Sequence, residues 1–515
     1  MTPPSHLEGA GKGEGRKAEP EAFPMSSASL GLAPALIDGR RAWSRDELLA
    51  EATQLATTLT ARHSRVLATL LDNSAAWVIA DLAADQAGVV HVPLPLFFTP
   101  QQIGHALATA GVDTLMTAPD IAARWPQAPA TRCVLGGASV ALVATAPPGL
   151  AAVTMPPGTS KITFTSGTTG APKGVCLSRE AMSRVVQGIA QALAPIGVQR
   201  HLCALPLAVL LENMAGLAAP WSVGATCIVP SLAELGWQGS SSFDVARFHA
   251  AVQQHQPHSL ILLPQMLAAW TAHLHATGQR APACLRFVAV GGAAVGSRAI
   301  ALARAAGIPA FEGYGLSEGA SVQTLNLPDA DRPGSVGRPL PHARVRVAAD
   351  GEIEVGGALF DGYLGDTPAD ASTGDAWWPT GDLGHIDADG FVHVQGRKKH
   401  VLITAFGRNV SPEWVEGALH DTGAIAQAVV LGDGQPQLGA VLWPRRADTD
   451  DATLADAVAR ANALLPDYAR VGHWVRALAP FDPASGMATA NGRARRAEVE
   501  LRHRAALDEA AVAMH

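Results

Sequence analysis

Lysine is scarce in this 515-residue chain, which has 38 lysines and arginines together but only six lysines. Two of the six lie near the amino terminus, and the others are Lys161, Lys173, Lys398 and Lys399. Aspartate and glutamate number 45, so the formal net charge is −7. Because nucleic-acid-binding proteins usually present a basic face, this composition disfavours nucleic acid as a partner. The scarcity also makes the position of each lysine informative.

Cysteine and long apolar runs are limited as well. The five cysteines are widely spaced and never form C-x-x-C, which argues against a disulfide framework or a zinc site and favours a reducing compartment, the cytoplasm. Residues 202–230 are the most apolar stretch, but prolines, glycine, glutamate and asparagine interrupt it, so we expect a buried element and no membrane span. Residues 1–26 lack an apolar run and are expected to be a disordered tail without a signal peptide.

Hydrophobic periodicity predicts an α/β fold. Helical stretches such as residues 46–62 alternate with short apolar runs such as residues 65–71 and 88–94, and the alternation recurs over residues 258–292. Such alternation is typical of βα units around parallel sheets. Beyond residue 332, alternating apolar residues are split by Asp350-Gly351 and Asp389-Gly390, which indicates hairpins of a β-rich lobe.

We therefore predict a large amino-terminal α/β domain over residues 27–396 and a small α+β domain over residues 397–515. Within the small domain, the run from 401 to 404 is expected to be a strand. Ser411, Pro412 and Glu413 predict the amino-terminal cap, first turn and acidic start of a helix.

One segment has the composition of a phosphate-binding loop. KITFTSGTTGAPKG, residues 161–174, runs from a β-like start into hydroxyls, glycines and one lysine. Glycines allow backbone N–H groups to approach an anion, hydroxyls donate to phosphate oxygens, and a lysine adds a positive charge. A Walker loop is excluded because Gly174 stands where a Ser or Thr should follow the lysine. The candidate phosphate-binding residues are Thr165, Ser166, Gly167, Thr168, Thr169, Gly170 and Lys173.

The string TSGTTGAPKG, residues 165–174, resembles the signature of the adenylate-forming superfamily, in its acyl-CoA synthetase and fatty acid ligase branch. Further segments are similar to the family's motifs in the family's order: GGAAV at 291–295, EGYGLSE at 312–318, TGDLG at 380–384 and GRKKHVLITAFGRNVSPEWVE at 396–416. The resemblance covers nearly the whole chain beyond the tail. It implies ATP and Mg²⁺ as cofactors, and CoA or a phosphopantetheine-bearing acyl carrier protein as the thiol acceptor.

The resemblance also implies roles for individual residues. Glu318 would bind magnesium, with Ser317 beside it at the phosphates, and Tyr314 has a flat face suited to stacking on adenine. The remaining residues assigned to adenine or ribose are Gly292, Ala293, Glu312, Gly313, Asp382 and Arg397.

Three further residues are assigned to the small domain and its movement. Lys399 would be the hinge on which the domain turns, and Gly407 would line the thiol tunnel. The family's catalytic lysine lies in a T-x-x-G-K-x-x-R context, and here Arg493 occupies its place. Arginine keeps the positive charge but is bulkier and differs in geometry, so adenylation is expected with an altered efficiency.

The implied activity is ATP-dependent activation of a carboxylic acid to an acyl-adenylate, followed by transfer to the thiol with release of AMP and pyrophosphate. The apolar segment 205–216 resembles the part of long-chain acyl-CoA synthetases that lines the acyl site, which favours a medium- or long-chain fatty acid. Leu210-Leu211 replaces the family's aromatic-histidine pair, and Glu212 leaves open an amino acid as substrate.

Two other functions are weighed against the ligase. GLSEG, residues 315–319, matches the G-x-S-x-G nucleophile elbow of a serine esterase using Ser317, although no helical period follows the serine. Arg493 raises the second alternative, a nucleotide-binding pseudoenzyme. The chain length of the acid, the acceptor, the oligomeric state and the pathway are not fixed by the sequence.

Overall fold

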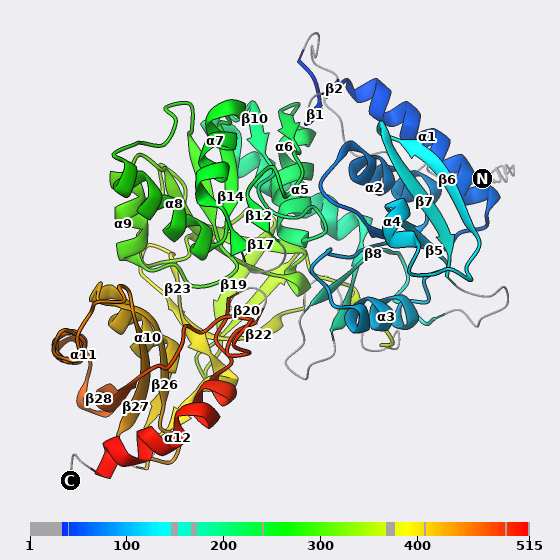
Figure 1. The fold of residues 1–515 in the computed structure, drawn as a ribbon. Helices are drawn as coiled ribbons and strands as arrows, with labels where there is room; N and C mark the ends of the chain where they lie inside the picture. The colour runs from blue at the N-terminus through cyan, green and yellow to red at the C-terminus, as the bar shows by residue number, and fades with distance from the viewer. Residues whose placement is uncertain are drawn as a thin grey trace, which may run out of the picture.

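The computed structural model describes residues 33–39, 41–145, 153–165, 172–238, 242–366, 376–405, 408–489 and 492–512. The expected tail, residues 1–26, lies outside these ranges. In Figure 1 the chain runs from the blue amino-terminal half at the right to the orange and red carboxyl-terminal domain at the lower left.

An eight-stranded sheet forms the core of the amino-terminal half. Its strands, in sheet order, are β21 (Gly362–Tyr363), β9 (Lys173–Ser178), β8 (Thr159–Thr165), β4 (Val90–Pro93), β3 (Val66–Leu70), β5 (Thr114–Thr117), β7 (Ala138–Ala144) and β6 (Ala130–Leu135). Strands β8, β4, β3 and β5 are parallel, as the alternating pattern predicted. The helices of this half are α1 (Arg45–Ala61), α2 (Ala75–Ala87), α3 (Pro100–Thr109) and α4 (Pro119–Ala122).

A nine-stranded sheet forms the second half of the large domain. Its order is β18 (Arg338–Pro339), β17 (Ser321–Leu325), β16 (Ala310–Leu316), β15 (Phe287–Val290), β14 (Ser259–Leu262), β10 (Arg200–Leu202), β11 (Thr226–Ile228), β1 (Leu36–Asp38) and β2 (Arg41–Trp43). The six strands from β16 to β1 run parallel. The helical elements are α5 (Arg179–Leu193), η1 (Ala194–Ile196), η2 (Glu212–Ala218), α6 (Ala219–Ser222), α7 (Val245–His255), α8 (Pro264–Thr277) and α9 (Ser297–Ala305), and β12 (Trp237–Gln238) pairs with β13 (Ser242–Phe243).

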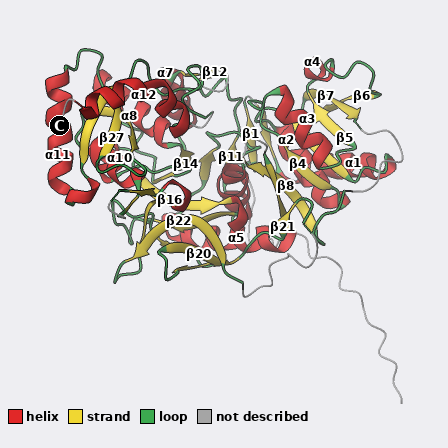
Figure 2. Ribbon diagram, turned by 90° about the horizontal axis from the view of Figure 1, so that it is seen from below, coloured by secondary structure: helices red, strands yellow, loops and turns green. Residues whose placement is uncertain are grey.

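Buried elements join the two large sheets. Helix α5 contacts β8 and β9 of the first sheet and β17 of the second, and Figure 2 shows it near the middle of the molecule. Next to it, η2 is a π-helix whose residues are buried from Glu212 to Leu217. The apolar stretch 202–230 therefore forms β10, η2, α6 and β11 in the interior, as predicted. No helix among the described residues is long and apolar enough to cross a membrane.

The β-rich lobe is a four-stranded antiparallel sheet of β19 (Ala343–Val347), β20 (Glu352–Gly357), β22 (Trp378–Ile386) and β23 (Val392–Arg397). Gly351 has φ of +84° and Gly390 of +83°, so both Asp-Gly pairs turn where they were predicted to. In these turns glycine takes the left-handed conformation at no steric cost.

The carboxyl-terminal domain is a separate three-stranded sheet with helices on both faces. Its strands are β26 (Ile425–Leu431), β27 (Leu438–Pro444) and β28 (Val471–Arg476); α10 (Pro412–Asp421) and α11 (Asp451–Leu464) cover one face and α12 (Arg496–Val512) the other. Residues from 398 to 410 form the short elements η5 (Lys398–His400), β24 (Leu402–Ile403) and β25 (Asn409–Val410), and η6 (Asp467–Ala469) precedes β28. The strand within 401–404 and the helix starting at Pro412 are confirmed.

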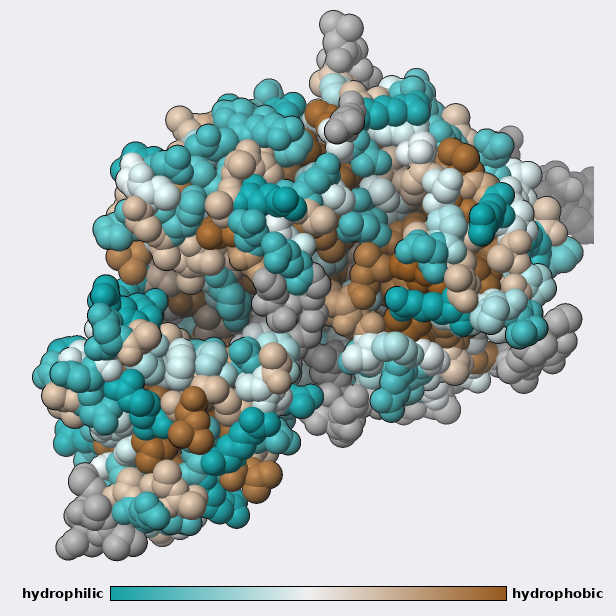
Figure 3. Space-filling model, viewed as in Figure 1, coloured by the Kyte–Doolittle hydropathy of each residue, from teal (hydrophilic) through white to brown (hydrophobic). Residues whose placement is uncertain are grey.

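The surface differs between the two domains. Figure 3 shows hydrophobic side chains gathered on the face of the large domain around β8, whereas the small domain shows a mixed surface in the same view.

Lys161 is a core residue and does not extend toward the phosphate loop. Its ammonium lies 2.8 Å from Asp81 Oδ1 and 2.5 Å from Asn213 Oδ1, and only 6% of the residue is exposed. Asp81 also contacts His91 Nδ1 at 2.6 Å, and His91 Nε2 lies 2.9 Å from the Thr69 hydroxyl. Burial alone would raise the pKa of Asp81, but Lys161 and His91 hold it well below its usual range. This network ties β8 to α2 and to η2.

We expect Lys161→Met to destabilise the fold by about 3–5 kcal/mol, because it leaves the largely buried Asp81 carboxylate, whose side chain is 21% exposed, without its cation. Urea unfolding followed by tryptophan fluorescence measures this loss, and ATP affinity should stay unchanged. The Asp81 contribution is present above its unfolded pKa and is lost as the pH falls below about 4. Weaker ATP binding at unchanged stability would contradict the core assignment.

Candidate active site

The first part of the site lies at the carboxyl end of β15. Gly291 and Gly292 follow this strand directly, and Gly292 has φ of +85°, a conformation that favours glycine. In open parallel sheets, ligands bind beyond the carboxyl ends of the strands. Gly292 and Ala293 are exposed or partly exposed at this edge and free to approach a nucleotide.

Glu312 on neighbouring β16 faces the same edge. Its Oε1 accepts the backbone N–H of Val295 at 3.0 Å, and the residue is 7% exposed. Burial raises the pKa of the Glu312 carboxyl to about 7, and the Val295 hydrogen bond opposes this shift. The carboxyl therefore titrates near neutral pH, at a position predicted to contact adenine.

We expect ATP affinity to rise between pH 6 and pH 8. Ionised Glu312 accepts a hydrogen bond from an amino group, whereas the protonated carboxyl competes as a donor. Because ATP titrates in the same range, the measurement is the difference between wild type and Glu312→Gln in the Kd of ATP. Parallel pH profiles for the two proteins would contradict this role.

Tyr314, Asp382 and Arg397 form a linked set. The Tyr314 hydroxyl donates to Asp382 Oδ2 at 2.6 Å, and Asp382 Oδ1 lies 2.8 Å from Arg397 Nε. Asp382 and Arg397 are paired across β22 and β23. Burial raises the pKa of Tyr314, and the neighbouring Asp382 adds to that shift, so the phenol stays neutral. The tyrosine thus holds the carboxylate that is predicted to bind the ribose, in addition to offering its ring.

Lys173 and Glu318 are joined through Tyr363, a residue that no sequence motif indicated. The Lys173 ammonium lies 5.1 Å from the centre of the Tyr363 ring, and the Tyr363 hydroxyl donates to Glu318 Oε1 at 2.9 Å. Thr165 pairs with Lys173 across β8 and β9, so the phosphate loop is the hairpin connection between them. Ser166, Gly167, Thr168, Thr169 and Gly170 lie outside the described residues.

The donor set around Glu318 fits a magnesium ion. Tyr363 occupies one carboxylate oxygen, and the other is left for a hard cation, which prefers oxygen ligands. Lys173 contacts the ring of the same tyrosine, so the predicted phosphate-binding lysine and the predicted magnesium ligand share one neighbour.

Ser317 does not lie in a nucleophile elbow. It begins the 3₁₀ turn η3 (Ser317–Gly319), which leads into strand β17 and not into the α-helix that an elbow requires. The next residues, Ala320 and Ser321, have φ of +54° and +127°, and such strained backbone clusters at functional sites.

Arg493 reaches this site from the small domain. Its Nη2 donates to the carbonyl of Gly292 at 2.6 Å, although the two residues are 201 positions apart. Lys399 lies nearby: burial lowers the pKa of its ammonium, and the charges of Arg397 and Arg493 lower it further. Three cations therefore gather around Asp382, which suits a site for phosphate and carboxylate groups.

The hinge segment is held at both ends. Lys398 contacts Asp350 and Glu352, each at 2.7 Å, and Glu352 also accepts the N–H of Gly381 in the TGD turn. Ser411 precedes α10 as predicted, but its hydroxyl donates to the Gln395 carbonyl at 2.8 Å and does not cap the helix. The hinge role of Lys399 stays a prediction, and Gly407 lies outside the described residues.

A second contact fixes the small domain in this orientation. Arg298, at the start of α9, donates to the carbonyl of Asp421 at the end of α10, 3.3 Å away. We expect Arg298→Ala to slow acid-dependent pyrophosphate exchange by about two- to fivefold, the scale of one exposed hydrogen bond, because it weakens this orientation. Thioester formation from supplied acyl-adenylate should not slow. Equal loss in both reactions would contradict the contact's role.

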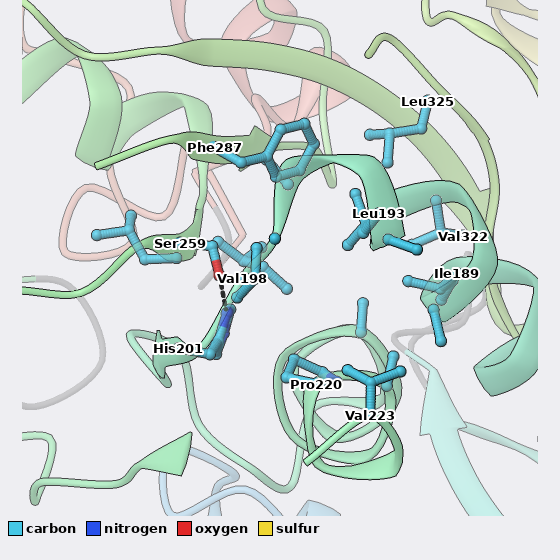
Figure 4. Close-up of a pocket in the computed structure, with 18 of the residues that line it drawn as sticks. Ile189, Leu193, Val198, His201, Pro220, Val223, Ser259, Phe287, Val322 and Leu325 are labelled. Atoms are coloured by element: carbon cyan, nitrogen blue, oxygen red, sulfur yellow. Dashed lines mark hydrogen bonds between the residues drawn. The ribbon is translucent and has the colours of Figure 1, made fainter. Parts of the chain in front are cut away.

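An apolar cavity of about 280 Å³ adjoins the nucleotide edge. Figure 4 shows Phe287, Leu325, Val322, Ile189 and Leu193 around it, with Pro220 and Val223 below and Ser259 and His201 on the opposite side. The predicted acyl segment contributes Leu211 and Ala215 to the wall, but no sequence pattern marked α5, β15 or β17 as its other sides. The register of β16 and β17 brings the cavity close to the predicted adenine-binding segment, since Leu325 pairs with Gly313 and Val322 with Gly315.

Comparison with known proteins identifies the family of the chain. The model of the AMP-binding enzyme family matches residues 26–364, and that of the AMP-binding enzyme C-terminal domain matches residues 399–513. A long-chain-fatty-acid–CoA ligase of Mycobacterium bovis is 43% identical over 155 residues, which are 30% of this chain and 26% of the relative. An indoleacetate–CoA ligase of Aromatoleum aromaticum is 31% identical over 306 residues, 55% of this chain and 57% of the relative.

The chain thus spans from a quarter to somewhat over half the length of these two curated relatives. Among solved structures, the O-succinylbenzoate coenzyme A synthetase of Bacillus subtilis in complex with ATP and magnesium ion has a TM-score of 0.70. It is 23% identical, and the match covers 90% of this chain and 96% of that one. The chain belongs to the AMP-binding enzyme family, within the adenylate-forming superfamily.

Proposed function

We propose that the protein activates a carboxylic acid with an apolar body by ATP-dependent adenylation and transfers the acyl group to CoA. The observation that carries this proposal is the sharing of strands between two sites. Strand β15 leads into Gly291 and Gly292 and also presents Phe287 and Ala289 to the cavity. Strand β17 follows Glu318 and presents Val322 and Leu325 to the same cavity. An acid in the cavity would thus reach the nucleotide at its carboxyl end.

In the first half-reaction, a carboxylate oxygen attacks the α-phosphorus of ATP and pyrophosphate leaves. Asp382, held by Tyr314 and Arg397, would bind the ribose hydroxyls, and Lys173 would hold the outer phosphates. Magnesium bound at Glu318 would neutralise phosphate charge. Arg493 already touches Gly292 and would stabilise the negative charge that develops at the reacting groups.

The second half-reaction would use another arrangement, because Arg493 now contacts Gly292 at the proposed adenylation site. We infer that the small domain turns at Lys399 and brings the segment of Gly407 to the site. Lys398 must remain tethered to Asp350 and Glu352, or exchange those contacts, as the domain moves.

The size of the cavity bears on the acid. Ligand pockets commonly measure about 300–1,000 Å³, so this one is at the small end. A medium-chain fatty acid or an aryl-substituted acid matches it better than a fully enclosed long chain. Relatives are named as ligases of long-chain fatty acids, indoleacetate and O-succinylbenzoate, so both alkyl and aryl acids occur among them.

The test is acid-dependent exchange of labelled pyrophosphate into ATP, with straight-chain acids of increasing length and aryl acids. Thioester formation is then compared with CoA and with a phosphopantetheinylated acyl carrier protein as acceptor. We expect exchange with a subset of acids and thioester formation with CoA. ATP binding without exchange for any acid would favour a pseudoenzyme, and transfer to the carrier protein alone would overturn CoA as acceptor.

A further inference from the structure

Buried polar side chains form a series of hydrogen-bonding contacts that begins in the wall of the apolar cavity. Ser259 on β14 and His201 on β10 are paired in register on parallel strands, and the Ser259 Oγ lies 2.9 Å from His201 Nδ1. Figure 4 shows this contact at the side of the cavity facing Ile189 and Leu193. The two residues are each 3% exposed, whereas Gln199, the other polar side chain of the described lining, is exposed.

The contacts continue behind the wall to Glu212. His201 Nε2 lies 3.3 Å from Glu212 Oε1, and the backbone N–H of Leu205 donates to Glu212 Oε2 at 3.3 Å. Glu212 is fully buried as the first residue of the π-helix η2. π-Helical turns are rare and frequently occur at functional sites. Gly216 in the same π-helix leaves the room for this pair, because a Cβ there would lie 3.0 Å from His201 Nε2 and still closer to the Glu212 carboxylate.

The charge of the buried Glu212–His201 pair determines which atom donates in each of these hydrogen bonds. Glu212 has no exposed surface, and its ion-pair partner is His201. Two other groups face it, Cys203 and Cys227; burial raises the pKa of both thiols, that of Cys227 to about 12, so both are neutral. An unbalanced buried carboxylate would be costly. One shared proton removes that cost, whether it makes a neutral acid with a neutral imidazole or an ion pair.

Both balanced states leave the Ser259 proton available for an acceptor in the cavity that Ser259 lines. If the proton is on Glu212, it is donated to His201 Nε2, so the neutral ring carries its hydrogen on Nδ1. If it is on His201, both ring nitrogens carry hydrogens. In each case Nδ1–H donates to Ser259 Oγ, and the serine hydroxyl does not need its own hydrogen for that contact.

We propose that Ser259 is a hydrogen-bond donor that selects acids carrying a second oxygen acceptor, such as a ketone, within an otherwise apolar body. This rests on the proposed function, since the cavity must hold the acid. Glu212 and His201 are positioning residues: they act on the acid through the orientation of the Ser259 hydroxyl. A plain alkyl chain fits the same cavity but leaves the donor without a partner, which costs binding.

The experiment compares decanoate with oxodecanoates bearing the ketone at positions 5 to 9, using kcat/KM for pyrophosphate exchange. We expect one position to exceed decanoate by about five- to tenfold, the worth of one hydrogen bond. Ser259→Ala should abolish that preference, so that the ratio of kcat/KM between the preferred oxodecanoate and decanoate falls to about one. The ratio between two acids does not depend on the amount of folded enzyme, so a merely structural role would not change it. Ser64→Ala, a hydroxyl paired with Thr114 outside the cavity, is the matched control.

Glu212→Gln distinguishes the relay from simple packing. The N–H of Leu205 selects the amide oxygen at Oε2, so the amide NH₂ faces His201 Nε2 and keeps the same hydrogen-bond direction. This variant should retain the preference. Equal or better exchange with decanoate than with every oxodecanoate, or a preference that survives Ser259→Ala, would overturn the proposal. No exchange with any acid would instead reject the proposed function on which it rests.

Discussion

Arg493→Ala is expected to lower kcat/KM for acid-dependent pyrophosphate exchange by about 10²–10³-fold, the scale of removing one charged donor from a reacting centre. Arg493 is placed for this role by its hydrogen bond to the Gly292 carbonyl. A guanidinium has five N–H donors in a planar fork, so one anchored nitrogen leaves others to meet a carboxylate or phosphate. Lysine could not make the anchor and the anion contact in the same planar way.

Three further measurements test this prediction. Arg493→Lys should lose less than the alanine variant, because the charge remains. Arg495→Ala, an exposed arginine of the same segment, should exchange at the wild-type rate. Transfer to CoA from supplied acyl-adenylate should survive in Arg493→Ala, since the proposed turn of the small domain would move Arg493 away before that step. An exchange rate within twofold of wild type would remove Arg493 from the adenylation site.

Local patterns were sufficient for much of the fold. Alternating apolar runs predicted the parallel strands β3, β4 and β14 because burial on both faces demands continuous hydrophobic segments. Asp-Gly pairs predicted the turns of the β-rich lobe, since few residues adopt a left-handed turn at low cost. The cap at Ser411 was predicted in position but not in contact, because the competing Gln395 carbonyl lies on a strand 16 residues earlier.

The site was only partly predictable, since its contacts connect distant parts of the chain. Lys161 and Lys173 stand at two ends of one motif, yet the first is buried against Asp81 and the second faces Tyr363. The two lysines lie on different strands, Lys161 on β8 and Lys173 on β9. No spacing rule indicates which of them points inward. Tyr363 lies on β21, which reaches the phosphate loop only by pairing with β9. The chain has three tyrosines, and this scarcity was the available signal that Tyr363 belongs to the site.

The same lesson applies to the cavity wall. The sequence leaves open that Glu212 holds a substrate ammonium, but its carboxylate contacts His201 and the backbone N–H of Leu205. The π-helix places it there, and a π-helical turn has no sequence pattern comparable to that of an α-helix. Contact with substrate therefore falls to Ser259, on a strand that no motif singled out.

Glu318→Gln is expected to lower kcat/KM for exchange by about 10²-fold or more, because the neutral amide binds magnesium weakly and several kcal/mol of charge stabilisation are lost. The shape of the side chain is kept, and Tyr363 can still donate to the amide oxygen. The Mg²⁺ concentration that gives half-maximal exchange should rise in the variant. Glu498→Gln, at the exposed start of α12, is the matched control.

Tyr363→Phe tests the hydrogen bond that Tyr363 donates to the Glu318 carboxylate. It removes one hydrogen bond to a charged acceptor, so a loss of about tenfold is expected, smaller than that of Glu318→Gln. If Tyr363 orients the carboxylate for the metal, the phenylalanine variant should also need more Mg²⁺. If the two variants lose activity with an unchanged Mg²⁺ requirement, Glu318 does not hold the ion. The Tyr363 link between Lys173 and Glu318 would then serve the phosphates alone, with the lysine as the principal charge.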